Sequence, residues 1–168
     1  MLRFVTIIYN TTQSSSSYRL SITLNDRGIR GALLSRFVPV LSDTLDARTL
    51  NSAVFEPACS GFTDSSPALR ELTLKSSLRL VAKLFPTSLD KLCRYLIRLQ
   101  SDPEPSVRTS TVIFVGKISP CLTETHRATL LLPAFTRAMS DDFTPCRLAA
   151  LWSVVGSRDY FDPKSIAT

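Results

Sequence analysis

Basic side chains recur at helical spacing in the middle of this 168-residue chain. Such a row could bind an acidic protein segment, a phosphoinositide headgroup or an RNA backbone, because each of these presents clustered negative charge. Like charges four residues apart cost a helix about 0.2–0.5 kcal/mol per pair, so the row does not serve helix stability. An ordinary solvated face is the competing interpretation, and no aromatic side chains interleave the row for base stacking. We call these residues the basic patch: Lys75, Arg79, Lys83, Lys91, Arg94 and Arg98.

Residues suited to catalysis or metal binding do not form a usable pattern. The single histidine, His126, has no serine or cysteine nucleophile tied to it by a motif. Successive cysteines are 34, 28 and 25 residues apart, too far for the close pairs of a zinc site, so we expect buried reduced thiols. Acidic pairs such as Asp141 and Asp142 fit solvated helix caps. The sequence therefore predicts no catalytic residue, no cofactor and no metal, and a protein that is not an enzyme.

An acidic turn followed by an arginine recurs four times along the chain. The arginines lie 40, 38 and 39 residues apart, and the last three follow their turn aspartates by six residues. An arginine in the first turn of a helix opposes the helix dipole and needs a partner. The natural partner is a turn aspartate of its own or of the neighbouring repeat, which would give a ladder of Arg–Asp hydrogen bonds. The ladder residues are Asp64, Arg70, Asp102, Arg108, Asp141 and Arg147, with Arg30 as the earliest arginine.

A period of about 39 residues predicts an all-α fold, an α-solenoid of antiparallel helix pairs with about three to four repeats. Each turn should follow a first helix, A, and start a second helix, B. The A helices are expected at 51–62, 89–100 and 125–139. Pro57 and Pro133 fall inside two of them, and each should either delay the start of its helix or kink it. The B helix after Arg70 is expected to carry one apolar face as far as Leu84. The last B helix, 148–155 with Trp152, should show an uncovered apolar side.

Composition is that of an ordinary globular domain, with 44% hydrophobic and 20% charged residues and a formal net charge of +6. The positive excess is centred on residues 61–120, where nine basic residues face five acidic ones. No uncharged apolar stretch approaches the ~18 residues of a membrane span. Residues 1–25 do not follow the repeat and are expected to form a divergent, flexible segment. The repeat array is expected over 26–168, with a truncated C-terminal end.

A two-helix unit with Asp, Pro and Arg at its turn resembles a HEAT repeat, an armadillo-type helical unit. The run from Gly61 to Ser76, then Leu80-Val-Ala-Lys-Leu84, is similar to the HEAT region of the N-terminal kinase-like (Scyl) pseudokinases. Further matching strings are Arg98-Leu-Gln100, Val107-Arg108 with Thr111, Gly116-Lys-Ile118 and Leu132-Pro-Ala-Phe-Thr-Arg-Ala138. The resemblance covers about Asp26 to Thr168.

That resemblance implies a non-catalytic, protein-binding scaffold in Golgi and retrograde vesicle traffic. Its partners would be the COPI coat or small-GTPase machinery, and it would lie in the cytoplasm, peripheral at Golgi or ER–Golgi intermediate membranes. A fungal relative that carries transfer RNA during export implies the alternative, an RNA carrier that uses the basic patch. The family's kinase domain has no counterpart in this sequence, because its five glycines form no Gly-rich phosphate loop and no His-Arg-Asp or Asp-Phe-Gly string occurs. The family's basic C-terminal tail, the segment that binds the COPI coat in that family, is also missing from this sequence. Direct coat binding by this chain would therefore need another surface.

Overall fold

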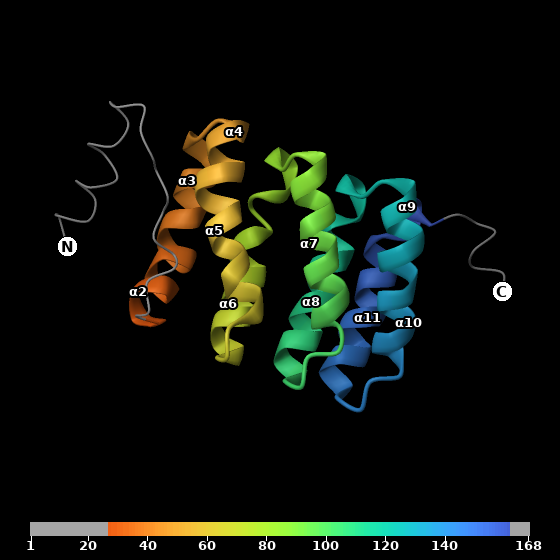
Figure 1. Cartoon of the computed structure of the whole chain (residues 1–168). Coiled ribbons are helices and arrows are strands. Elements are labelled where there is room, and N and C mark those ends of the chain that lie inside the picture. Colours follow the sequence, from red (N-terminus) through yellow and green to blue (C-terminus); the bar gives the residue numbers. More distant parts are fainter. Residues whose placement is uncertain (1–26, 162–168) are drawn as a thin grey trace, which may run out of the picture.

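Every secondary-structure element of the computed structural model, which describes residues 27–161, is helical (Figure 1). The all-α solenoid predicted from the repeat is therefore confirmed. The predictions for residues 1–25 and for Asp26 lie outside the described residues. The predicted array, 26–168, extends beyond them at its C-terminal end. The α-helical segments are α2 (Arg27–Ala32), α3 (Val38–Thr44), α4 (Ala47–Thr49), α5 (Glu56–Ala58), α6 (Pro67–Ser77), α7 (Pro86–Leu99), α8 (Pro105–Ile118), α9 (Glu124–His126), α10 (Leu132–Met139) and α11 (Thr144–Gly156).

Three of the long helices contain an internal proline, and each proline follows a wider, π-helical stretch. Those stretches are Leu33–Phe37, Leu50–Phe55 and Arg127–Leu131, which stand before Pro39, Pro57 and Pro133 respectively. A proline in a helix lacks the N–H donor and its ring pushes against the carbonyl four residues earlier. The wider turn relieves that clash locally. The prolines at 57 and 133 therefore divide their A helices as expected, without ending them.

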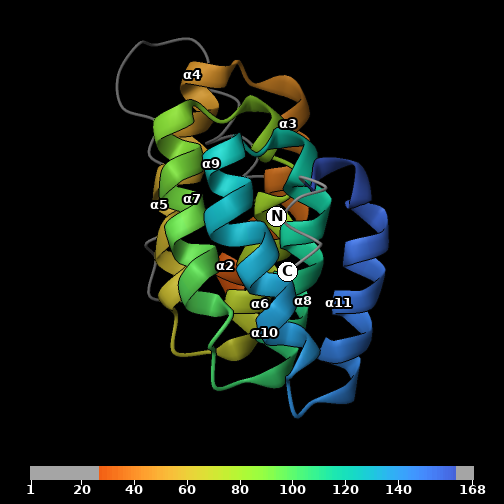
Figure 2. The ribbon, with the colours of Figure 1, turned by 90° about the vertical axis from the view of Figure 1, so that its right-hand side faces the viewer.

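The long helices form two layers that run along the solenoid (Figures 1 and 2). One layer holds the A helices, which are the α4–α5 run, α7 and the α9–α10 run. The other holds the B helices, which are the α2–α3 run, α6, α8 and α11. Their apolar sides meet in one continuous core, in which Leu96 of α7, Val115 of α8 and Phe135 of α10 are almost fully buried.

The A helices begin and end within a few residues of the predicted ranges, but the B helix after Arg70 is shorter than predicted. Helix α6 ends at Ser77, and only a 3₁₀ turn at Val81–Lys83 follows it. The buried side chain of Asn51 fixes this segment, because its amide donates to the Lys83 carbonyl and accepts from the Phe85 N–H. The predicted apolar face survives in another form, since Leu80 and Val81 are still buried.

The B helices α8 and α11 pack closely where Gly116 meets Ser153. A Cβ placed on Gly116 would lie 2.8 Å from the Ser153 Cβ, whereas one on Gly156 would meet nothing within 4 Å. We predict that Gly116→Ala lowers the free energy of unfolding by roughly 1–3 kcal/mol, because α8 and α11 must separate. The matched Gly156→Ala should stay within about 0.5 kcal/mol of wild type. Urea titration followed by circular dichroism measures both, and equal stability of the two variants would contradict the packing described.

Candidate functional site

Two of the ladder arginines, Arg70 and Arg108, each bridge two consecutive turns. Arg70, at the start of α6, donates from Nε and Nη2 to the two carboxylate oxygens of Asp102, both at 2.7 Å. Its Nη1 donates to the backbone carbonyl of Asp64, in its own turn, also at 2.7 Å. Arg108 repeats this arrangement one unit later, with 2.6 and 2.9 Å to the Asp141 carboxylate and 2.9 Å to the Asp102 carbonyl. The sequence left open whether each arginine would pair with the aspartate of its own turn or of the neighbouring turn. For Arg70 and Arg108 the paired carboxylate belongs to the following turn.

The turn aspartates hold the backbone of the turn as well as the arginine. The N–H groups two residues further on, in Ser66, Glu104 and Phe143, donate to the carboxylates of Asp64, Asp102 and Asp141 at 2.8–2.9 Å. These are turn contacts before the helix begins, so the carboxylates do not cap the B helices in the way the sequence suggested. Arg30 completes the series by bonding the Asp64 carboxylate.

The arginines and their aspartates shift each other's protonation equilibria in the expected directions. The hydrogen bond from Arg108 lowers the pKa of the Asp141 carboxyl from 3.8 to about 2. Burial raises the pKa of Asp64, but the Ser66 N–H and the Arg30 guanidinium outweigh it and leave the pKa below its ordinary value. The Asp102 carboxylate in turn raises the pKa of Arg70. The charged forms are thus favoured in the folded state, which suits a structural ladder.

The structure divides the basic patch instead of presenting it as one row. Because α6 ends at Ser77, Arg79 and Lys83 do not continue the helical face of Lys75, so the premise of one continuous stripe is wrong. Lys75 pairs with Glu71 at 2.6 Å. The Lys83 ammonium donates to the backbone carbonyls of Ser42 and Leu45, at 2.7 and 3.1 Å, and so satisfies the C-terminal end of α3.

On α7 the patch is divided again. Lys91 pairs with Glu56 of α5, 2.5 Å away, across the space between neighbouring A helices. Arg94 and Arg98 are exposed and lie one helical turn apart on α7. Arg79, which follows α6 in the other layer, is exposed as well. Three of the six basic residues thus have an acidic or carbonyl partner, and three exposed guanidinium groups remain for a polyanion.

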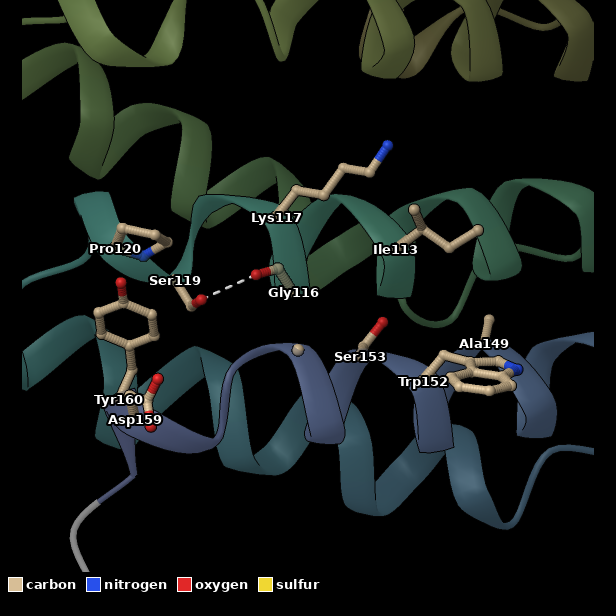
Figure 3. A pocket seen from close by; sticks show the side chains of 11 residues that line it. Ile113, Gly116, Lys117, Ser119, Pro120, Ala149, Trp152, Ser153, Asp159 and Tyr160 are labelled. Atoms are coloured by element: carbon tan, nitrogen blue, oxygen red, sulfur yellow. Dashed lines mark hydrogen bonds between the residues drawn. The ribbon is translucent and has the colours of Figure 1, made fainter.

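A shallow groove of about 470 Å³ runs between α8 and α11 and the segment that follows each of them (Figure 3). Ile113 of α8 and Trp152 of α11 line one end of the groove, and Lys117 extends from α8 away from α11 (Figure 3). At the other end Tyr160 lies beside Pro120. The groove combines apolar and aromatic surface with the charges of Lys117 and Asp159, the mixture typical of sites that bind protein segments.

Sequence reasoning did not identify this groove as a site. It noted Trp152 on an uncovered helix side, and 75% of that residue is exposed. It did not connect Trp152 with Lys117 or Tyr160, because those residues belong to different repeats. The repeat register itself was the available signal, since it places α8 and α11 side by side.

Reactive groups do not assemble elsewhere in residues 27–161. Burial raises the pKa of the Cys59 thiol to about 12 and that of Cys93 to about 11, so neither is a ready thiolate. The His126 Nε2 lies 2.9 Å from the Asp90 carboxylate, a pair on two neighbouring A helices. No group of three or more His, Cys, Asp or Glu side chains in this part of the chain is placed to hold a metal ion. None of the helices described is both long and apolar enough to cross a membrane.

The chain is similar in sequence to kinase-like proteins of lower eukaryotes. It is 32% identical over 144 residues to a probable inactive serine/threonine-protein kinase, scy1, of Dictyostelium discoideum, and this covers 86% of the chain. It is also 32% identical over 140 residues, or 83% of the chain, to the protein kinase domain-containing protein ppk3 of Schizosaccharomyces pombe. This chain is a Scy1-like HEAT region. It spans only 18% and 22% of the length of these two relatives, and its own sequence carries none of the kinase strings.

A third relative extends the Scy1-like comparison to export proteins. Cytoplasmic export protein 1 of Saccharomyces cerevisiae is 32% identical over 178 residues, which covers 99% of this chain and 23% of that protein. The crystal structure of Cex1p matches the fold with a TM-score of 0.79 and 30% identity over 98% of this chain and 33% of the Cex1p chain. A search of protein-family models finds no match.

We predict that the ladder makes folding stability sensitive to acid through Asp141. Its pKa is lower in the folded state, at about 2, than the ordinary 3.8, so its stabilising effect is complete above pH ~4. That effect is lost as the pH falls through 2. Asp141→Asn should remove this part of the pH dependence and cost about 1.5–3 kcal/mol at pH 7, because Arg108 loses a charged partner.

The control for this prediction is Asp142→Asn, an exposed neighbour in the same turn. Urea midpoints between pH 7 and pH 2 provide the measurement. The account is contradicted if the free energy of unfolding falls equally in Asp141→Asn and in the wild type between pH 7 and pH 2. In that case Arg108 does not lower the pKa of Asp141 in the folded state.

Proposed function

We propose that this Scy1-like HEAT region is a non-catalytic scaffold that binds protein partners in Golgi and retrograde vesicle traffic. The observation that supports it best is the α8–α11 groove, an open surface of apolar, aromatic and charged side chains on a rigid repeat array. Its partners would be the COPI coat or small-GTPase machinery. The scaffold would act in the cytoplasm, peripheral at Golgi or ER–Golgi intermediate membranes.

Binding without catalysis agrees with the chemistry of the described residues. The buried thiols of Cys59 and Cys93 are held protonated, and the acidic side chains of the turns are engaged in the ladder. The relative scy1 is itself named as probably inactive. A repeat array offers extended surface, and its function depends on which side chains that surface displays.

A second candidate function is the RNA carrier, because the similarity to Cytoplasmic export protein 1 spans nearly the whole chain. Such a carrier would bind transfer RNA through the three exposed guanidinium groups of Arg79, Arg94 and Arg98. The scaffold is favoured because the other basic-patch residues are engaged with Glu71, Glu56 and the end of α3. No aromatic platform accompanies the exposed arginines in the predicted row, so base stacking would contribute little.

We predict that purified COPI coat or a Golgi small GTPase binds the full chain through the groove. Ile113→Ser/Lys117→Glu changes one partly exposed apolar and one basic residue of α8 and should weaken binding about tenfold or more, as loss of a central contact does. The control variant, Ile97→Ser/Arg98→Glu, replaces one apolar and one basic residue of α7 in the same way and should leave protein binding unaltered. Surface plasmon resonance with the purified partners measures the change.

Transfer RNA provides the second arm of this experiment. The scaffold function predicts no transfer-RNA binding at low salt. Binding that weakens steeply with salt, and a salt slope that falls by roughly two in the Arg79→Ala/Arg94→Ala/Arg98→Ala variant, would instead establish the carrier function. Equal protein binding by the two paired variants would exclude the groove as the docking site.

A further inference from the structure

Helix α11 displays a face that the same positions of the earlier B helices bury. Four residues after the ladder arginine stand Leu34, Leu74 and Val112, which are 1–2% exposed beneath the next repeat. The corresponding residue of α11, Leu151, is 53% exposed. The neighbouring positions of α11 continue this apolar face: Leu148, Trp152 and Val155 are 51%, 75% and 56% exposed.

The ladder arginine of α11 also lacks the contact that its three predecessors make. Arg30, Arg70 and Arg108 each bond the carboxylate of the following turn. Arg147 donates from Nη1 to the carbonyls of Asp141 and Asp142, at 2.8 and 3.0 Å, as Arg70 and Arg108 donate to carbonyls of their own turns. Its Nη2 donates only to the adjacent Thr144 hydroxyl at 2.8 Å, and no carboxylate in residues 27–161 takes the place of Asp102 or Asp141.

The three earlier interfaces show what covers such a face. At each of them a B helix lies along the preceding one, and the turn before it presents an aspartate to the arginine. The contact includes a hydrogen bond between the B helices in two cases, from the Ser76 hydroxyl to the Leu34 carbonyl and from the Ser153 hydroxyl to the Val112 carbonyl. A matching occupant of α11 therefore needs an apolar helix and an aspartate at one defined place in front of it.

We propose that the α11 face is a docking surface for a further HEAT-type helix pair, whose turn aspartate accepts from Arg147. The aspartate fixes the register, because a guanidinium and a carboxylate pair through two parallel hydrogen bonds only in one orientation. The apolar residues Leu148, Leu151 and Val155 then lie under the incoming B helix, and Trp152 loses its contact with water. This inference deepens the scaffold function and rests on it: the array recognises one partner class by the same contacts that join its own repeats.

The test uses Trp152, the only tryptophan of the chain, as an internal probe. The full chain is extended after Thr168 by a second copy of residues 86–121, which contains an A helix, the Asp102 turn and a B helix. The covalent tether supplies a high local concentration, so the added pair can fold as it docks. We expect the Trp152 emission to shift to shorter wavelength and its quenching by acrylamide to fall relative to the chain without the extension.

Two substitutions make the test specific for the proposed contact. Arg147→Met, or Asp102→Asn in the added copy alone, should reverse most of the shift. Arg158→Met, at an exposed arginine beyond the end of α11, should not. The inference is overturned if Trp152 stays equally accessible with the extension, if both specific substitutions leave the shift unchanged, or if the unextended chain already buries Trp152 in a dimer. Because no coat component or RNA is present, these outcomes are independent of the proposed partners of the groove.

Discussion

A guanidinium that binds two turns at once is the contact on which this structure depends. Arg70 and Arg108 each tie the carbonyl of their own turn to the carboxylate of the next, so every rung joins consecutive repeats at a defined height. Apolar side chains supply most of the attraction between helices, but they do not fix a register by themselves. The rungs do so, because displacement by one turn of helix would leave a nearly buried charge without its partner.

Packing elsewhere follows from that register. With the turns aligned, Gly116 comes close enough to Ser153 that no side chain fits between the two helices, and the groove beside Trp152 opens at the ends of α8 and α11. The internal prolines of the α2–α3 run and the A helices are absorbed by π-helical turns, which let those helices bend around the core without breaking. Rigid repeats thus carry a small number of displayed side chains, and these side chains provide the candidate functions.

The sequence predicted the solenoid, the A helices and the family, because a period of about 39 residues and the Asp-to-Arg spacing are local patterns. It did not predict the end of α6 at Ser77, because tertiary hydrogen bonds from Asn51 and Lys83 decide that end. For the same reason the basic patch looked continuous: Glu56, which pairs with Lys91, is 35 residues away in the chain. The α8–α11 groove needed the structure, because its residues come from two repeats and from the segments after them.

The most direct measurement of the central claim is a double-mutant cycle on one rung, with Arg70→Met, Asp102→Asn and the two combined, followed by urea unfolding at pH 7. Both side chains are about nine-tenths buried, at 11% and 5% exposure. If the rung joins the repeats, the two substitutions should be coupled by about 2 kcal/mol or more. A coupling below about 0.5 kcal/mol, the size found for exposed ion pairs, would contradict the account and leave apolar packing alone to set the register.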